Sequence, residues 1–560
     1  MINLSSAPLA RRIDAALGRI PCDLLIRDVH YLDVFSCRFR QGDIAIIDGA
    51  IVGLEPGLKA KRVLDGRGGW LVPGFIDAHV HVESSMMVPA HFEQAVLGLG
   101  TTSAICDPHE LANVQGLDGI RYFLDAASTL SMDLHVMLSS CVPATHMETN
   151  GGGHLDATQL ASLAGHPRAL GLAEMMNMPG VLNREPDTLA KLQAFEGRPV
   201  DGHCPLLSGQ ALSAYAAAGM SSCHESSQLD EAAEKLTKGM AVWIREGSVA
   251  RDLETLVPLL TLATSTSIGF CTDDRNPYDI ARDGHIDHLV RTAIARGVAP
   301  EVAYRAASWS VARHYGLGRV GAVAPGYQAD LVLLEDMRGT VIRQVLKRGV
   351  PTSELPSAEA GRSAVVNSIR ASVPEAADLA GPEGQVHVIE VLEGKIITGR
   401  RVDRHDAPGI SRLTVLERYG GGSRPANAYV SGFGALEGAI ASSVAHDSHN
   451  LSVVGSNPED MRVALAALVE SAGGFCVARN GEVIALLSLP LGGLMSTRSP
   501  PELKAGIEEL REASRAIGCQ LAEPFLQLAF LSLPVIPSLK LTDKGLVDVE
   551  RFELIDVRAA

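Results

Sequence analysis

The sequence predicts an α/β protein built around a parallel, TIM-like (β/α)8 barrel. Between residues 73 and 318, short apolar strands alternate with helical stretches. β-Sheet patterns occur directly before and directly after this region. The 560 residues leave room for three or four domains at roughly 150 residues each. We therefore expect a small split β-sheet domain and a C-terminal α/β domain beside the barrel.

The split β-sheet domain is expected to begin before the barrel and to be completed after it. Residues 1–72 open with a polar helical segment and continue, at about 22–70, as short β-branched runs between Gly and Asp turns. This pattern predicts a small antiparallel sheet, which we interpret as the N-terminal part of a β-sandwich. Residues 319–364 contain the return strands and a linker. The linker composition, rich in Ala, Ser, Gly and Pro, extends over 353–385.

The recognisable barrel strands all end on polar residues. They are "GFIDAHVHV", "GTTSAICDP", "LHVMLSSCVP", "ALGLAEMM", "PVDGHCP", "GMSSCHES" and "SIGFCTDD". Because the carboxyl ends of barrel strands open onto one mouth, these polar residues should meet in space although they are far apart in the chain.

Residues 365–560 are predicted to form the C-terminal domain. Helices are expected over 458–474 and 500–518. The expected strands are "VHVIEVLEGKIITG", "AYVSGFG", "LSVVGS" and "GFCVARNGEVIALLSL". Strands and helices alternate here, as is typical of an α/β domain.

Composition and charge narrow the function classes. The formal net charge is −16 without a basic run, which argues against a nucleic-acid or anionic-membrane partner and favours a small molecule. The nine cysteines contain no CxxC pair, so we expect a reduced chain without a disulfide framework. We find no run of about 18 apolar residues, and the apolar stretches at the start are too short for a signal peptide. These observations predict a cytoplasmic protein.

Two histidines at one strand end suggest a metal site. His79 and His81 are two residues apart on a strand, so both side chains point to the same face, with Asp77 and Glu83 on that side further along. A single histidine is more often a surface or hydrogen-bonded core residue. Further metal-binding side chains end other strands, however: Glu174, His203, His224 and Asp273. Imidazole and carboxylate groups are first-choice ligands for transition metals.

These motifs resemble the amidohydrolase superfamily, and within it the bacterial adenine deaminases. The resemblance rests on "PGFIDAHVHVESSMM", "CDPHELANV", "LAEMMNMPGV", "DGHCP", "CHES" and "CTDDR", and on "AHDSHNLSVVG" and "LPLGGLMS" near the C-terminus. The superfamily's metal-binding barrels carry HxH on strand 1 and aspartate on strand 8. This chain offers Glu174 where hydantoinases and dihydroorotases use a carboxylated lysine, which favours the adenine deaminase branch.

The resemblance implies a metal-dependent barrel that converts adenine to hypoxanthine and ammonia with a hydroxide between two divalent ions. One ion would be held by His79, His81, Glu174 and Asp273, and the other by Glu174, His203 and His224. Manganese or iron is implied, and the ligand types also suit Zn²⁺. Asp273 would accept the proton of the attacking water and return it. Its alternative role is metal ligation alone. Glu83 is a candidate for protonating a ring nitrogen.

Other residues near the predicted strand ends are candidates for substrate contacts. His109 and Glu110 are expected to contact substrate or assist proton movement, although Asp107 and Pro108 are also a common helix opening. Further candidate purine contacts are Ser84, Ser85 and Asp274, with local capping and turn bonding as the alternative. The histidines of "HDSHN" (446–450) are expected to be structural or exposed. Their alternative is a contribution to the barrel mouth or an additional ion.

The residues alone leave two other functions open. The same site would serve hydrolysis of a cyclic amide or another aminated heterocycle, since pocket residues decide the substrate. A non-catalytic purine- or metal-binding relative is the third hypothesis, although all six predicted ligands are present. We expect a homodimer, because twofold symmetry is the commonest among oligomers.

Overall fold

The structure is a computed structural model that describes residues 6–358, 367–422 and 424–559. Its central element is a barrel of eight parallel strands. The strands are β5 (Phe75–Val80), β6 (Thr101–Cys106), β7 (Asp133–Leu138), β8 (Ala169–Met175), β9 (Val200–Gly202), β10 (Ser222–Cys223), β11 (Ala241–Arg245) and β12 (Ile268–Cys271). The predicted barrel is therefore confirmed. The sequence analysis had missed β11.

The barrel is closed by pairing between its first and last strands. A parallel bridge joins Val80 to Asp273. The amide of Asp273 donates to the carbonyl of His79 at 3.0 Å, and the amide of His81 donates to the carbonyl of Asp273 at 3.2 Å. Asp273 has a φ of 53°, in the left-handed region that non-glycine residues seldom adopt. The two backbone hydrogen bonds hold this unusual conformation directly beside the HxH pair.

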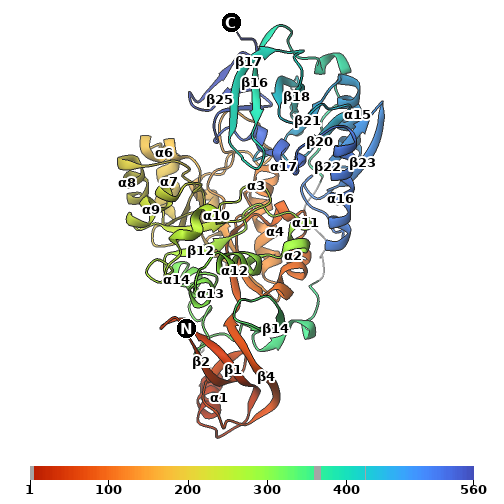
Figure 1. Cartoon of the computed structure of the whole chain (residues 1–560). Helices are drawn as coiled ribbons and strands as arrows, with labels where there is room; N and C mark the ends of the chain where they lie inside the picture. Colours follow the sequence, from red (N-terminus) through yellow and green to blue (C-terminus); the bar gives the residue numbers. More distant parts are fainter. Residues whose placement is uncertain (1–5, 359–366, 423, 560) are drawn as a thin grey trace.

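Helices follow the strands and cover the outside of the barrel (Figure 1). They are α2 (Pro89–Val96), α3 (His109–Gln115), α4 (Leu117–Ala127), α5 (Ala157–Leu163), α6 (Met178–Asn183), α7 (Pro186–Ala194), α8 (Gly209–Ala217), α9 (Leu229–Thr237), α10 (Leu253–Leu256), α11 (Pro277–Asp283), α12 (Ile286–Ala295), α13 (Pro300–Ala306) and α14 (Trp309–His314). This βα alternation leaves the carboxyl ends of the strands free to form a site.

A seven-stranded sheet lies at the end of the molecule that carries the N-terminus (Figure 1). Helix α1 (Ser6–Ala16) precedes it. Its strands are β1 (Cys22–Asp33), β2 (Arg38–Ile47), β3 (Ala50–Gly53), β4 (Ala60–Pro73), β13 (Leu331–Leu334), β14 (Ile342–Lys347) and β15 (Val350–Pro351). The predicted split is confirmed, since β13 pairs with β4. The prediction of a purely antiparallel sheet was wrong, because β1 and β4 are parallel.

The C-terminal part contains an eight-stranded and a three-stranded sheet. The strands are β16 (Gln385–Val391), β17 (Thr398–Arg404), β18 (Ile410–Leu416), β19 (Ala426–Ser431), β20 (Ala439–Ser442), β21 (Leu451–Gly455), β22 (Gly474–Arg479), β23 (Glu482–Ser488), β24 (Leu539–Thr542), β25 (Gly545–Asp548) and β26 (Glu553–Ile555). Its helices are α15 (Pro458–Glu470), α16 (Pro500–Ala516) and α17 (Pro524–Ala529). Both predicted helices are present, whereas β18, β20, β24, β25, β26 and α17 were missed. Of the predicted linker, residues 359–366 lie outside the described residues.

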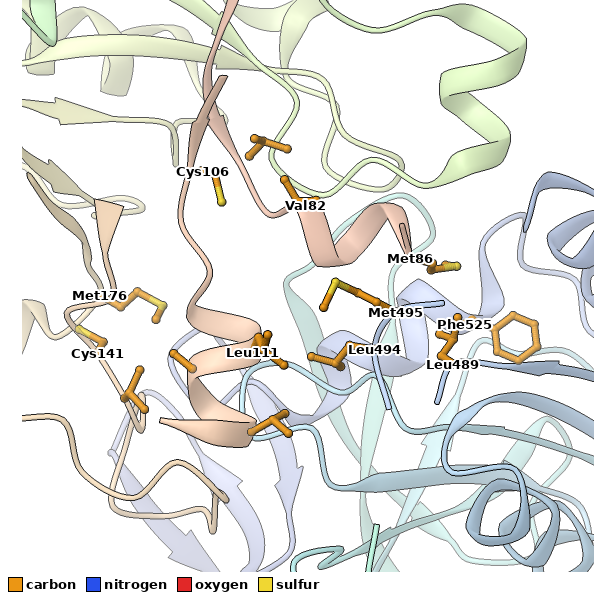
Figure 2. Close-up of a cluster of buried hydrophobic side chains, with 14 of the residues drawn as sticks. Val82, Met86, Cys106, Leu111, Cys141, Met176, Leu489, Leu494, Met495 and Phe525 are labelled. Carbon is orange, nitrogen blue, oxygen red and sulfur yellow. The ribbon is translucent and has the colours of Figure 1, made fainter. Parts of the chain in front are cut away.

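The C-terminal part packs on the barrel through a shared hydrophobic core. Met86 and Leu111 follow barrel strands, and they belong to the same buried cluster as Leu494, Met495 and Phe525. Figure 2 shows these side chains gathered between the two parts. Burying apolar surface contributes about 25 cal/mol per Å² to stability. A continuous core of this kind therefore attaches the two parts strongly to each other. The C-terminal part is therefore fixed over the mouth of the barrel. Within the described residues, no helix combines the length and apolar character needed to cross a bilayer.

Candidate metal centre

The carboxylate of Glu174, at the end of β8, is the centre of a cluster of buried histidines. Its Oε1 lies 3.7 Å from Nε2 of His79 and 3.4 Å from Nε2 of His81. Its Oε2 contacts Nδ1 of His203 and lies 3.3 Å from Nε2 of His224. Each of these side chains is at most 7% exposed. The strand ends thus bring together residues that are separated by up to 145 positions in the sequence.

Asp273 completes one side of the cluster. Its Oδ1 lies 3.5 Å from Nε2 of His79 and 3.1 Å from Nε2 of His81. Its Oδ2 lies 3.1 Å from Nη1 of Arg245, at the end of β11. The six side chains that the sequence analysis selected as metal ligands therefore lie in one buried cluster: His79, His81, Glu174, His203, His224 and Asp273.

The donor atoms fit divalent metal ions. Nδ1 of His81 lies 2.9 Å from the carbonyl oxygen of Asp107, so a proton on Nδ1 leaves Nε2 with a lone pair toward the carboxylates. Nε2 of His203 is buried and has no hydrogen-bond partner among the described residues. Buried polar atoms without partners are costly, and a bound cation would satisfy this nitrogen. Imidazole nitrogens combined with carboxylate oxygens match the preferences of Mn²⁺, Fe²⁺ and Zn²⁺.

Asp77 accepts hydrogen bonds from the ends of two strands that carry candidate ligands. Its Oδ1 accepts the amide of His79 at 3.3 Å and the amide of Thr272 at 3.1 Å. Its Oδ2 accepts the hydroxyl of Thr272. Burial raises the pKa of Asp77 to about 7, although the bonds from Thr272 oppose this. This residue links β5 to β12, so it positions the backbone that carries His79 and Asp273.

His109 and Glu110 extend the cluster away from Glu174. Nδ1 of His109 lies 3.2 Å from Oε1 of Glu174, and Nε2 of His109 lies 3.3 Å from Oε1 of Glu110. Asp107 faces His109 at 3.1 Å. Both His109 and Glu110 begin helix α3, as the helix-opening alternative had implied, and both still line the cavity. The helix opening is thus present, and the contact with substrate stays a prediction.

Glu83, Ser84 and Ser85 do not lie where a continued strand would place them. Strand β5 ends at Val80, and these residues form a 3₁₀ turn over Val82–Ser85. Oε1 of Glu83 accepts the amide of Leu111 at 3.1 Å. The expectation that Glu83 follows the HxH on one strand face was wrong, because the period-two pattern ends with the strand. Burial and then Glu110 raise the pKa of Glu83 to about 8.

The candidate substrate contacts have different partners and line different cavities. Ser84 donates its hydroxyl to Oδ1 of Asp274, and Ser85 donates to the carbonyl of Val82 at 2.5 Å. Asp274 lines a cavity beside the candidate metal ligands, whereas Glu83 and Ser84 line a neighbouring one with Phe525. The bond of Ser85 is the local kind that the alternative had described, whereas the bond of Ser84 joins residues 190 positions apart.

A cavity opens beside the candidate ligands. Its barrel side carries candidate metal ligands and other charged groups. Among these are Glu225 and Arg245, which sequence reasoning had missed. Arg245 ion-pairs with Glu225 and lies 3.0 Å from Oδ2 of Asp252. The signal available in the sequence was the apolar run "AVWI" directly before Arg245.

The C-terminal part closes the other side of the cavity. It contributes a mostly apolar wall of Ile396, Phe530, Leu533 and Ile536, together with His446 and Asp447. Nδ1 of His446 lies 2.6 Å from Oε1 of Glu110, and Nε2 of His449 ion-pairs with Oε2 of the same residue. Both histidines are buried. Of the two states expected for the "HDSHN" histidines, structural or exposed, the exposed one is wrong, and His446 lies at the barrel mouth as the alternative had it, since the C-terminal part folds over the mouth.

The parallel barrel with its buried histidine–carboxylate cluster defines the class of protein. The amidohydrolase family model matches residues 70–352, and the model of the adenine deaminase C-terminal domain matches residues 390–553. The chain is 49% identical to an adenine deaminase of Cereibacter sphaeroides (strain KD131), over 98% of this chain and all of the relative. It is 46% identical to adenine deaminase 1 of Rhizobium meliloti (strain 1021), with the same coverage.

These matches cover both the barrel and the C-terminal part. By its barrel, the chain is an amidohydrolase. By identity over nearly its full length, it belongs to the adenine deaminase family.

Proposed function

We propose that this protein deaminates adenine: adenine and water give hypoxanthine and ammonia. The observation that carries the proposal is that four histidines converge on Glu174, with Asp273 beside two of them, in a chain that is about half identical to adenine deaminases over nearly its whole length. His79, His81, Glu174 and Asp273 would hold one divalent ion, and Glu174, His203 and His224 a second. Such ions lower the pKa of bound water and supply a nucleophile near neutral pH.

Asp273 is the proposed proton carrier of the reaction. Arg245 and the histidine pair hold its carboxylate from both sides, so its orientation is fixed before substrate arrives. It would take a proton from water and return one to the leaving amine. His109 and Glu83 are proposed to supply a proton to the purine ring. The proposed purine contacts are Glu110, Asp274, Ser84 and Ser85.

We further propose manganese as the metal, with iron or zinc as substitutes, since the donor set is nitrogen and carboxylate oxygen. A role in purine salvage, a cytoplasmic location and a homodimer complete the proposal. The chain is proposed to divide into the regions 1–72, 73–318, 319–364 and 365–560.

The test uses protein prepared with added Mn²⁺ and analysed for its metal content. Adenine is added, and the ultraviolet change to hypoxanthine is followed together with ammonia release. We expect both signals, and we expect Asp273→Asn to reduce them by about 10²–10⁴-fold. Metal analysis of the variant separates loss of the proton carrier from loss of a ligand. Exposed Asp230 is a matched control, and Asp230→Asn should retain wild-type activity.

Other outcomes of this experiment would support different functions. Ring opening of a cyclic amide without ammonia release from adenine would indicate the amide hydrolase. Tight adenine binding without turnover, in protein with about two ions per chain, would indicate a non-catalytic relative.

A further inference from the structure

The C-terminal part places one unpaired imidazole nitrogen at the cavity. His446 is buried and lines the cavity, and its Nε2 has no hydrogen-bond partner among the described residues. The neighbouring wall of Ile396, Phe530, Leu533 and Ile536 has no polar side-chain atoms. A heterocycle against this wall would lose water from its ring nitrogens, and an unpaired buried nitrogen is costly. His446 is therefore well placed to supply the missing partner.

The ring of His446 is held in one orientation by three contacts. Its Nδ1 lies 2.6 Å from Oε1 of Glu110. Its ring stacks on Phe530, with centroids 4.5 Å apart and planes at 10°. Its backbone amide donates to the carbonyl of Ala529 at 3.1 Å. These contacts involve Nδ1, the ring face and the backbone, and they leave Nε2 free.

His449 contacts the same carboxylate but has a different role. Its Nδ1 accepts the backbone amide of Ala445 at 3.2 Å, so in the neutral ring the proton is on Nε2, which faces Glu110. A cation bound to Nε2 of His449 would require the opposite tautomer. His449 is also absent from the cavity lining. Glu110 is thus held between two histidines, of which only His446 reaches the cavity.

The charges around His446 favour a hydrogen-bond donor. Burial lowers the pKa of His446, but Glu110, Asp274 and Asp447 raise it to about 9. With both nitrogens protonated, Nδ1 donates to Glu110 and Nε2 donates into the cavity. Oδ2 of Asp447 also has no partner among the described residues, but an ionised carboxylate only accepts. His446 therefore suits an acceptor nitrogen of a bound heterocycle, whereas Asp447 suits a donor N–H group.

We propose that His446 is a specificity-determining residue whose Nε2 donates a hydrogen bond to N3 or N7 of the bound purine. This inference rests on the proposed adenine deaminase function. N1 is excluded because it adjoins C6, the carbon that must face the candidate metal ligands. The C-terminal part would thus recognise the ring while the barrel carries out the chemistry.

The test compares adenine with 3-deazaadenine and 7-deazaadenine, in which one ring nitrogen is replaced by C–H. The wild-type enzyme should discriminate against one of these analogues by about 10- to 100-fold in kcat/KM. In His446→Asn, the amide nitrogen replaces Nδ1 toward Glu110, but no atom replaces Nε2. The discrimination should fall to about threefold or less. Dividing the two ratios cancels the intrinsic reactivity of the analogue.

Two further variants separate recognition from structural support. His446→Gln places an amide nitrogen near the position of Nε2 and should restore most of the discrimination. His154→Asn, at an exposed histidine, is the matched control, and its analogue ratio should equal that of wild type. Melting temperature and metal content identify a variant that fails to fold.

The outcomes are distinct. Wild-type discrimination retained in a folded His446→Asn would overturn the proposal, as would a wild-type enzyme that accepts both analogues as well as adenine. Failure of the metal-loaded wild type to release ammonia from adenine would count against the proposed function itself. If His446→Asn does not fold, His446→Ala takes its place, and wild-type discrimination retained in that folded variant would overturn the proposal.

Discussion

The Nε2 atoms of His79 and His81 lie 3.1 Å apart, and both face the carboxylates of Glu174 and Asp273. Two imidazole nitrogens on one strand end converge on a single point, as the spacing of two residues requires. A cation shared by these groups would neutralise the two buried carboxylates.

Replacing His81 tests this arrangement. We expect His81→Asn to lose about one metal ion per chain and nearly all deaminase activity, because the shorter amide cannot reproduce the Nε2 donor. Metal analysis and ammonia release measure the two effects. Exposed His154 provides the matched control, since His154→Asn should keep both. Full metal content and activity in His81→Asn would contradict the proposed ligand set.

Arg245 should be important for stability as well as for the site. Its guanidinium lies among three carboxylates, those of Glu225, Asp252 and Asp273. Arg245→Gln leaves these buried charges without that partner, so we expect a loss of about 3–5 kcal/mol in stability. Thermal unfolding measures this as a lower midpoint. The partly exposed pair of Arg251 with Asp279 is the comparison, and Arg251→Gln should cost about 0–1 kcal/mol.

The junction between the barrel and the split sheet should make acid stability depend on Asp133. Its oxygens lie 2.7 Å from Nζ of Lys347 and 2.7 Å from Nη2 of Arg348. Burial raises the pKa of Asp133, but the positive charges of Lys347 and Arg348 lower it by more than burial raises it. The pKa is therefore well below the ordinary value. The folded pKa is therefore below the unfolded one. The stabilisation is present above about pH 4 and is lost as the pH falls through the folded pKa.

Asp133→Asn removes this contribution. The wild type should melt at a higher temperature than the variant at pH 7, and the difference should shrink progressively below about pH 4. A constant difference across that range would show that Asp133 acts by packing rather than by its charge.

Lys540 should make stability depend on pH in the neutral to alkaline range. Its Nζ donates to the carbonyls of Ile396 and Phe530, each at 2.8 Å. Burial lowers its pKa from 10.5 to about 7. Between these values the unfolded chain holds a proton that the folded chain has lost, so the contribution to stability rises with pH from about 7 to 10.5. Lys540→Met should lack this rise, as melting temperatures at a series of pH values would reveal.

The six candidate ligands were recognisable because each follows an apolar strand in the sequence. Barrel topology then brings strand ends together, so one rule placed His79 near Asp273 across almost 200 positions. Arg245 also ends a strand, but its guanidinium group cannot bind a metal ion, so the pattern of metal ligands did not include it. Glu83 was misplaced because local alternation does not reveal where a strand stops and a 3₁₀ turn begins.

The contribution of His446 depends on packing between distant parts of the chain. No local pattern in "HDSHN" specifies that it faces Glu110, which is more than 300 positions earlier. The parallel pairing of β1 with β4 was missed for a related reason, since β-branched runs predict strands but not their partners.

A ligand that touches both walls of the cavity is thermodynamically linked to the docking of the C-terminal part on the barrel. Docking is held in part by Glu110, whose two oxygens face His446 and His449. The coupling is reciprocal: if the ligand strengthens the association by some factor, the association strengthens ligand binding by the same factor. Any change that loosens the association weakens ligand binding by the same coupling, even at a position far from the reacting atoms.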